Sequence, residues 1–451
     1  MARRETFWLE RRESWASQAE DARDEAGVDY ARVVHSASFR RLQGKTQILN
    51  LGDSDFYRNR LTHSLEVAQI ASGIVSQFEK NFPGHPAIPH LPNSNQIQAI
   101  GLTHDLGHPP FGHGGEVALN YCMRDAGGFE GNGQTLRILA RLEKFSKAAG
   151  SNLTRRSLLG VLKYPVAYAR ANHPLLRPRL EPNTTTVRII DRAASKPPKC
   201  YLDGEADVVG WILDPLSPAD RDLFQTAEDR PGAHAKALHK SLDCSIMDLA
   251  DDIGFGVHDL EDALALGLIG EPAFRAGVSE EDAASFLDGL KARYPGESQN
   301  NVYEAMVAGL FGDGGTRKRF IGRMVFHMIS NARIEEAAGF EEPLLRYRAS
   351  IAPAPKRFLQ ALHKVVLEQV IQSAAVQHLE FKGQKMVVDV FETLASEPKR
   401  FLSPATYALH EAAGGALRVI CDHIAGMTDG FLLKTYDRLF SPRTGSIFDR
   451  L

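Results

Sequence analysis

Histidine is concentrated in one stretch of this chain, and that stretch limits how the chain can fold. Packing alone does not need imidazoles at this density, so we expect the stretch to carry chemistry and the rest of the fold to hold it in place. Six of the 16 histidines lie within residues 58–116, namely His63, His85, His90, His104, His108 and His113.

The centre of this stretch follows a predicted helix over residues 94–106. Ile97, Ile100 and His104 recur at helical spacing, which directs the His104 imidazole inward. Asp105 lies about 100° further round, so both side chains can reach one point beyond the helix end, where Gly107 and two prolines stop it. This pair suits a hard or borderline divalent cation. The alternative is a hydrogen-bonded core histidine beside a solvated aspartate.

Two more segments supply residues of the same type. An amphipathic helix is predicted to begin near His63, so that its imidazole could face His104. Residues 241–253 are apolar on two sides, which predicts a central helix, and Asp251 shares one of those sides. A carboxylate there is costly unless it is paired or metal-bound. The apolar stripe after His63 consists of Leu65, Ala68, Ala71, Val75 and Phe78.

Several blocks of sequence carry a resemblance to a known family. RLTHSLEV from residue 60, HDLGHPPFGHGGE from 104 and ADDIGFGVHDLED from 250 resemble the signature of the deoxyguanosinetriphosphate triphosphohydrolase-like branch of the HD-domain superfamily. The likeness extends to FRRLQGKTQ from residue 39 and DHIAGMTD from residue 422, so it covers most of the chain in order. It implies an all-α fold, an HD-domain helical bundle with additional C-terminal helices.

The resemblance also implies a reaction and a metal site. Members hydrolyse a deoxynucleoside triphosphate at the α-phosphate, releasing the deoxynucleoside and inorganic triphosphate. The family favours Mn²⁺ or Mg²⁺, and nitrogen and oxygen ligands also admit Fe²⁺, Co²⁺ or Zn²⁺. The residues that match the metal ligands are His63, His104, Asp105 and Asp251.

His108, His113 and Glu116 are the candidates for proton chemistry. If a helix begins after Gly112, His113 and Glu116 stand three residues apart on one face, where the carboxylate can orient the imidazole and raise its basicity. An oriented histidine can protonate a departing alkoxide, and the resemblance implies the same role. The alternative is a surface ion pair.

Four residues match family positions that contact substrate. Arg60 suits the α-phosphate because its planar fork of donors fits phosphate oxygens, and neighbouring Arg58 could be a solvated charge. Gln47 and Asp259 match residues directed at the sugar 3′-hydroxyl, although both could be ordinary surface groups. Phe255 stands where the family commonly has tyrosine, so the ring remains and the hydroxyl contact is lost.

Residues 153–199 are unusually basic in a chain whose net charge is −3. They predict a local anion surface for a triphosphate, a neighbouring subunit or single-stranded DNA, or else a solvated basic loop. Lys163 and Lys199 are the candidates for phosphate contact. The bases are Arg155, Arg156, Lys163, Arg170, Arg177, Arg179, Arg188, Arg192, Lys196 and Lys199, against only Glu181 and Asp191.

Composition places the chain among ordinary globular proteins. It is 43% hydrophobic and 24% charged, and its four cysteines form no Cys-x-x-Cys pair, which fits a reducing compartment. The charged N-terminus is unlike a signal peptide, and no apolar run approaches a membrane span, so we expect a cytoplasmic protein.

The predicted organisation has three parts. Residues 1–50 form a helical segment that contributes to the active site, 51–270 form the HD core with the basic insertion at 153–199, and 271–451 form a helical region that packs on the core. In the last part, residues 321–334 and 359–376 are predicted amphipathic helices, and strand signals are few. Related enzymes form oligomers, often hexamers, so a homo-oligomer is expected.

Two other classes of function remain open at this stage. One is a different HD-type phosphohydrolase acting on a nucleoside monophosphate, a cyclic dinucleotide or an alarmone. The other is a weakly active protein that binds nucleotides or single-stranded nucleic acid through the basic stretch.

Overall fold

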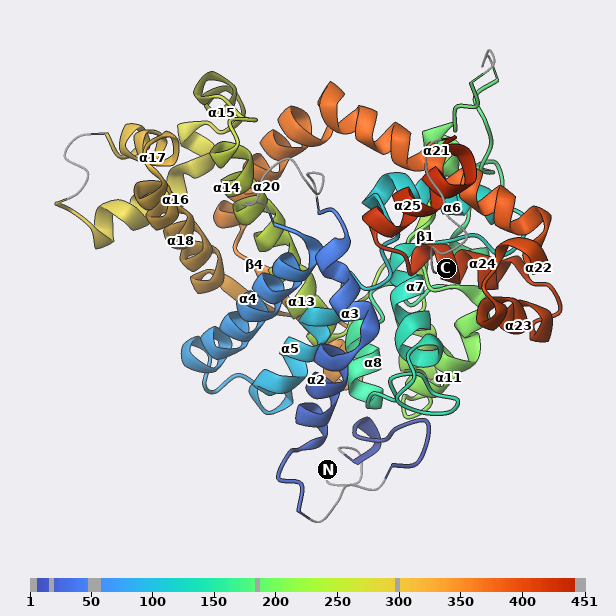
Figure 1. Cartoon of the computed structure of the whole chain (residues 1–451). Helices are drawn as coiled ribbons and strands as arrows, with labels where there is room; N and C mark the ends of the chain where they lie inside the picture. The colour runs from blue at the N-terminus through green and yellow to red at the C-terminus, as the bar shows by residue number, and fades with distance from the viewer. Residues whose placement is uncertain (1–5, 16–19, 48–57, 183–186, 297–300, 443–451) are drawn as a thin grey trace.

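Helices dominate the computed structural model of the chain (Figure 1), which describes residues 6–15, 20–47, 58–182, 187–296, 301–442. Within these ranges the strands form only two antiparallel hairpins, β1 with β2 and β3 with β4. The prediction of an all-α fold is therefore confirmed. Among the described residues, no helix is both long enough and apolar enough to cross a lipid bilayer.

Three helices at the centre of the molecule pack against one another: α4 (Arg60–Asn81), α5 (Ser94–Thr103) and α13 (Leu242–Ile253). Each begins at a polar residue that accepts a backbone N–H of the first turn, and at α4 Asn59 and Thr62 form a reciprocal capping box. The sides of α4 and α13 that face each other are apolar and fully buried. This packing fixes where the ends of the three helices meet.

Two flanking groups of helices cover the central three. One group continues the core of α4 and α13, and the other packs on the N-terminal segment and α5. The first contains α14 (Asp259–Ala265), α15 (Glu271–Gly277), α16 (Glu280–Arg293), α17 (Val302–Phe311), α18 (Gly314–Ser330), β3 (Ala332–Glu336), α19 (Pro343–Arg346), β4 (Tyr347–Ile351) and α20 (Pro353–Val366). The second contains α2 (Glu25–His35), α3 (Ala37–Arg41), η1 (Leu42–Gly44), α7 (Gly131–Arg137), η3 (Ile138–Leu142), α8 (Arg155–Val161), α11 (Ala206–Leu213) and α12 (Pro218–Phe224).

The C-terminal helices build a separate cluster on α6 (Gly112–Cys122). The long α21 lies along α6, and Figure 1 shows the helices that follow it gathered on the same side of the molecule. The histidine-rich stretch thus runs from the central helices α4 and α5 into α6, on which this cluster packs. The cluster contains α21 (Ala374–Ser396), α22 (Pro398–Phe401), α23 (Pro404–Ala412), α24 (Leu417–Ala425) and α25 (Asp429–Phe440).

Short elements connect these groups. They are η2 (Ile88–His90), α9 (Tyr168–Ala171), α10 (Arg192–Ser195), η4 (Asp203–Glu205), β1 (Ala227–Arg230), β2 (Ala233–Ala237), and the π-helical turns η5 (Gly254–His258) and η6 (Leu367–Ile371). The four cysteines are buried and free, so no disulfide closes any of the loops.

Some sequence-based boundaries are wrong. The helix predicted for residues 321–334 ends at Ser330, because residues 332–336 pair with β4 across five register positions. The helix predicted for 359–376 is broken by a π-helical turn, and α21 starts afresh with Ser373 as its N-cap. Leu65 is 48% exposed rather than part of the buried stripe, because it lies about 200° round the helix from His63.

Candidate metal centre and active site

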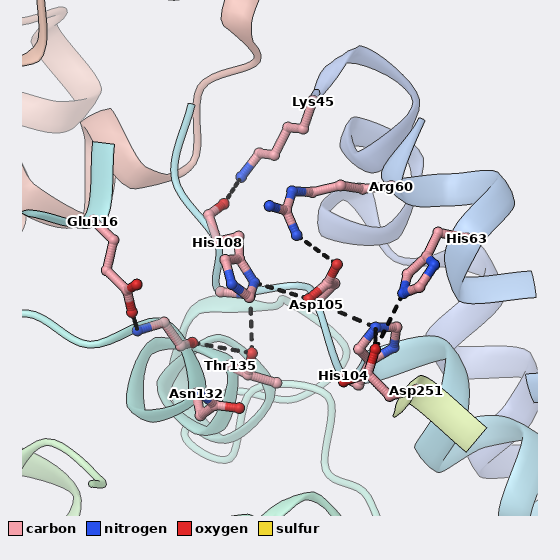
Figure 2. Close-up of polar contacts among 12 residues, drawn as sticks. Lys45, Arg60, His63, His104, Asp105, His108, Glu116, Asn132, Thr135 and Asp251 are labelled. Atoms are coloured by element: carbon pink, nitrogen blue, oxygen red, sulfur yellow. Dashed lines mark hydrogen bonds and ion pairs between the residues drawn. The ribbon is translucent and has the colours of Figure 1, made fainter. Parts of the chain in front are cut away.

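Three side chains from the three central helices converge at one point. His63 comes from the first turn of α4, His104 caps the C-terminal end of α5, and Asp251 lies near the end of α13. One ligand atom from each lies within 4.8 Å of the others, an arrangement that could hold a metal ion (Figure 2). Asp251 Oδ1 lies 3.2 Å from His63 Nε2 and 3.7 Å from His104 Nε2.

His104 has the hydrogen-bonding pattern expected of a histidine that binds a metal. Its Nδ1 lies 2.7 Å from the carbonyl oxygen of Gly101 and donates to it, so Nε2 carries the lone pair. That Nε2 is buried and has no hydrogen-bond partner among the described residues. A carbonyl that fixes the ring in this way is the usual support of a metal-bound histidine. The predicted helix over residues 94–106 ends at Thr103, which places His104 at the helix end.

Electrostatics favour a cation at this point. Burial alone would raise the pKa of Asp251, but Lys163 and the two imidazoles hold it well below its usual range, so the carboxylate is ionised. Burial alone would lower the pKa of His63, whereas the carboxylates of Asp251 and Asp259 raise it to about 9. A proton and a divalent cation therefore compete for the same imidazole.

Asp105 lies beside the group and is held by the guanidinium of Arg60 and the imidazole of His108. Arg60, itself 4% exposed, donates to Oδ2, and Oδ1 lies 2.9 Å from His108 Nδ1. The same Oδ1 lies 3.6 Å from His104 Nε2. Burial and the charge of Arg60 lower the pKa of His108 to about 4, so its imidazole is neutral. The role of Asp105 as a fourth ligand stays a prediction.

Arg60 has donors left for a substrate. Its Nε is buried without a hydrogen-bond partner among the described residues, and a Cβ on Gly112 would lie 3.0 Å from its Nη2. The guanidinium therefore lies against the backbone that leads into His113. Its neighbour Arg58 is not a solvated charge, because it forms ion pairs with Glu66 and Glu261.

α6 begins at Gly112, and its first turn presents His113 and Glu116 together. His113 Nδ1 lies 3.1 Å from Glu116 Oε2, while Glu116 Oε1 accepts the backbone N–H of Gly131 at 2.9 Å. The His113 side chain is 67% exposed and that of Glu116 only 4%. A fixed carboxylate thus orients an accessible imidazole, and its contact with Nδ1 leaves Nε2 for proton exchange with a substrate.

Two residues outside the histidine stretch hold this loop, and sequence reasoning missed both. Lys45 is 2% exposed and donates to the carbonyl oxygens of His108, at 2.6 Å, and Ala425, at 2.9 Å. Asp429 accepts the backbone N–H groups of Thr46, at 2.9 Å, and Phe111, at 3.0 Å. Both lie within family-like blocks, which was the only sequence signal available, since their partners lie between 63 and 383 residues away.

Lys163 and Lys199, predicted to contact phosphate, are both ion-paired. Lys163 Nζ lies 2.8 Å from Asp248 Oδ1 and 3.3 Å from Asp251 Oδ2. Lys199 Nζ lies 2.8 Å from Glu130 Oε1 and 3.5 Å from Glu116 Oε1. Each lysine therefore borders a site carboxylate, and its contact with a phosphate stays a prediction.

The remaining predicted substrate contacts are Asp259, Phe255 and Gln47, and their contact with a substrate stays a prediction. Asp259 is 3% exposed, and burial raises its pKa to about 7 although the nearby His63 opposes this shift. Phe255 packs edge-on against the His363 ring with centroids 5.0 Å apart, so its ring contributes to packing. Gln47 is half-buried, and its Oε1 has no hydrogen-bond partner among the described residues.

Most of the arginine and lysine side chains of residues 153–199 contact carboxylates from other parts of the chain. Arg156 pairs with Asp243 at 2.7 Å, and Arg170 pairs with Asp229 at 2.7 Å. Arg179 pairs with Asp191 inside the stretch, and among the described residues Lys196 alone of the ten has no carboxylate partner. The stretch is therefore largely neutralised, which sequence composition does not reveal.

Comparison with known proteins agrees with this geometry. The HD domain family matches residues 60–194, which include His63, His104 and Asp105, and the phosphohydrolase-associated domain family matches residues 350–438. A deoxyguanosinetriphosphate triphosphohydrolase-like protein 2 of Deinococcus radiodurans is 42% identical over 448 residues, covering 99% of both chains. Two further deoxyguanosinetriphosphate triphosphohydrolase-like proteins are each 43% identical to the chain. The match to the protein of Shewanella pealeana covers 99% of this chain and 98% of the relative, and the match to that of Aliivibrio fischeri covers 92% of each. The chain therefore belongs to the deoxyguanosinetriphosphate triphosphohydrolase-like family of HD-domain phosphohydrolases.

Proposed function

We propose that this protein is a metal-dependent deoxynucleoside triphosphate triphosphohydrolase. The observation that carries the proposal is the convergence of His63, His104 and Asp251 beside Arg60, with the His113–Glu116 pair on the adjoining loop. The names of the relatives point to the same substrate class. The reaction would release the deoxynucleoside and inorganic triphosphate.

The metal would be held by His63, His104, Asp105 and Asp251, and Mn²⁺ or Mg²⁺ suits these nitrogen and oxygen donors. When bound, it would activate a water molecule and polarise the α-phosphorus. The ionised Asp251 supports this assignment, as does the buried Nε2 of His104, which has no hydrogen-bond partner in the described part of the chain.

The protein's own side chains would handle the substrate's charge and protons. Arg60 would bind an α-phosphate oxygen through the donors that Asp105 leaves unused. His113 would protonate the 5′-oxygen as it leaves, and Glu116 would keep that imidazole oriented. Gln47 and Asp259 would contact the sugar, and Lys163 and Lys199 would contact the outer phosphates.

Product analysis tests the reaction. Each of the four deoxynucleoside triphosphates is incubated with the enzyme in Mn²⁺, Mg²⁺ or Co²⁺, and the products are separated by ion exchange. We expect the deoxynucleoside and inorganic triphosphate in a 1:1 ratio. Orthophosphate or pyrophosphate as the first product would instead indicate another HD-type phosphohydrolase, and binding without turnover would indicate a nucleotide-binding protein.

A matched variant ties the activity to the proposed site. His113→Ala should retain the metal content and melting temperature of the wild type, because the side chain is exposed, and should lose most of the triphosphate release. Wild-type rates in this variant would remove His113 from the mechanism. The expected homo-oligomer can be measured in the same preparations by light scattering.

A further inference from the structure

A hollow of about 1000 Å³ lies between α16, α18 and the start of α20. Figure 1 shows α16 and α18 on the opposite flank of the molecule from α24 and α25. None of the residues that line the hollow belongs to the metal-ligand group or to the loop that leads into His113. The hollow is therefore a separate cavity, and its volume lies in the range of small-molecule sites.

Positive charge gathers in this hollow. The described residues that line it include no aspartate or glutamate. In a chain whose net charge is −3, four cationic side chains around one cavity form a strong local field for an anion. They are Arg293, Arg319, Arg323 and Arg333.

Two of these arginines are stacked on aromatic rings. The Arg293 guanidinium lies 4.3 Å from the centroid of the Phe326 ring, and that of Arg323 lies 3.9 Å from the centroid of Tyr294. Stacking holds the plane of a guanidinium but leaves the N–H donors at its edge for other partners. The Phe326 ring thus presents the Arg293 donors to the hollow at a lower cost in side-chain entropy.

Some arginines of this hollow have fewer carboxylate partners than the arginines of residues 153–199. Arg293 and Arg333 form no ion pair with any carboxylate that the structure describes, and Arg319 donates to Thr316 Oγ1 at 3.2 Å. By contrast, Arg156 and Arg170 each hold a carboxylate at 2.7 Å. Arg293 and Arg333 are both exposed, and exposed arginines without a carboxylate partner at a shared cavity are suited to phosphate oxygens.

We propose that this hollow binds a small molecule that carries two or more phosphate groups. Several arginines are directed at one cavity, and a polyphosphate supplies several anionic oxygens that can contact them at once. Inorganic triphosphate and a nucleoside triphosphate share this chemistry. The site is independent of the proposed reaction, because it shares no residue with the catalytic centre.

Calorimetric titration of the full chain with inorganic triphosphate, and separately with ATP, tests the proposal. The double variant Arg293→Ala/Arg333→Ala removes two charges from the hollow, and Lys236→Ala/Lys382→Ala removes the same charge from exposed positions elsewhere. A second variant, Gly322→Glu, keeps every arginine and adds a carboxylate at a lining position where a Cβ meets nothing within 4 Å. Melting temperatures establish that each variant is folded.

We expect at least one of the two probes to bind the wild type and the lysine control equally. Both variants of the hollow should weaken that binding by about tenfold or more, since each disturbs charge-assisted hydrogen bonds to the anion. Triphosphate binding that both variants of the hollow weaken assigns the inorganic anion to it, and weakened binding of ATP alone assigns a nucleotide. Failure of both probes to bind, or equal binding in all variants, would overturn the proposal. So would a change of oligomeric mass in the variants without a change of binding, which would make the hollow a subunit interface.

Discussion

The carboxylate of Asp429, at the start of α25, accepts the backbone N–H of Phe111 at 3.0 Å, across 318 residues of sequence. Phe111 and Gly112 both have positive φ, 61° and 56°, so the chain enters α6 through two consecutive left-handed residues. Such a conformation costs about 1–2 kcal/mol at a residue other than glycine, and surrounding contacts have to maintain it. Asp429 therefore positions His113 through the backbone.

Replacing Asp429 by asparagine should lower kcat by about tenfold or more while the metal content stays unchanged. The amide keeps the size of the side chain but loses the charge that strengthens its bonds to Thr46 and Phe111. Thr428→Ala is the control, because it removes the N-cap of α25, which should cost about 1 kcal/mol of stability, without touching Phe111. Equal kcat in D429N and the wild type would show that Asp429 is only structural.

His113 and Glu116 should act as one unit in catalysis. Glu116→Gln keeps the acceptor for the Gly131 N–H but removes the charge that orients the imidazole, so kcat should fall by about 10- to 100-fold. The double variant with His113→Ala should be hardly slower than His113→Ala alone, because residues of one unit are not additive. Independent, multiplying losses in a double-mutant cycle would contradict this coupling.

Gly107→Ala should destabilise the protein by about 2 kcal/mol or more, as measured by urea denaturation. A Cβ on Gly107 would lie 2.0 Å from the Gly131 carbonyl oxygen and 2.3 Å from Thr135 N, so the loop could not pack against α7. Gly84→Ala is the matched control, since a Cβ there meets nothing within 4 Å. Similar unfolding midpoints for the two variants would refute the close packing.

The pKa of His327 predicts a pH effect on stability. Burial and the positive charge of Arg293 lower it from its usual value of 6.5 to about 4. Between these values the unfolded chain binds the proton and the folded protein does not, so stability falls as the pH drops from about 6.5 to 4. His327→Gln removes this contribution. The melting temperature of the variant minus that of the wild type should therefore be larger at pH 4.5 than at pH 7.5. A constant difference across this range would show that His327 does not titrate in this way.

Metal binding should stabilise the folded protein. Adding Mn²⁺ after chelation should raise the melting temperature of the wild type, since a ligand that binds only the folded state stabilises it. His104→Ala should lose this increase, whereas His85→Gln should keep it because His85 lies outside the ligand group. An equal increase in both variants would place the metal elsewhere.

The hydrophobic pattern of the sequence identified the three helices that bring His63, His104 and Asp251 together, because helical periodicity is a local property. It could not identify Lys45 or Asp429, whose partners are up to 383 residues distant. It also overestimated the free charge of residues 153–199, since the carboxylates that pair with Arg156 and Arg170 lie outside that stretch. Pairing across long distances depends on the tertiary fold, and one sequence does not encode it in a local pattern.

In the proposed reaction, water attacks the α-phosphorus and the 5′-oxygen leaves with a proton. Turnover of a deoxynucleoside triphosphate in H₂¹⁸O, followed by mass spectrometry of both products, tests it most directly. The account predicts one ¹⁸O atom in the inorganic triphosphate and none in the deoxynucleoside. Label in the deoxynucleoside, or in released orthophosphate or pyrophosphate, would contradict it.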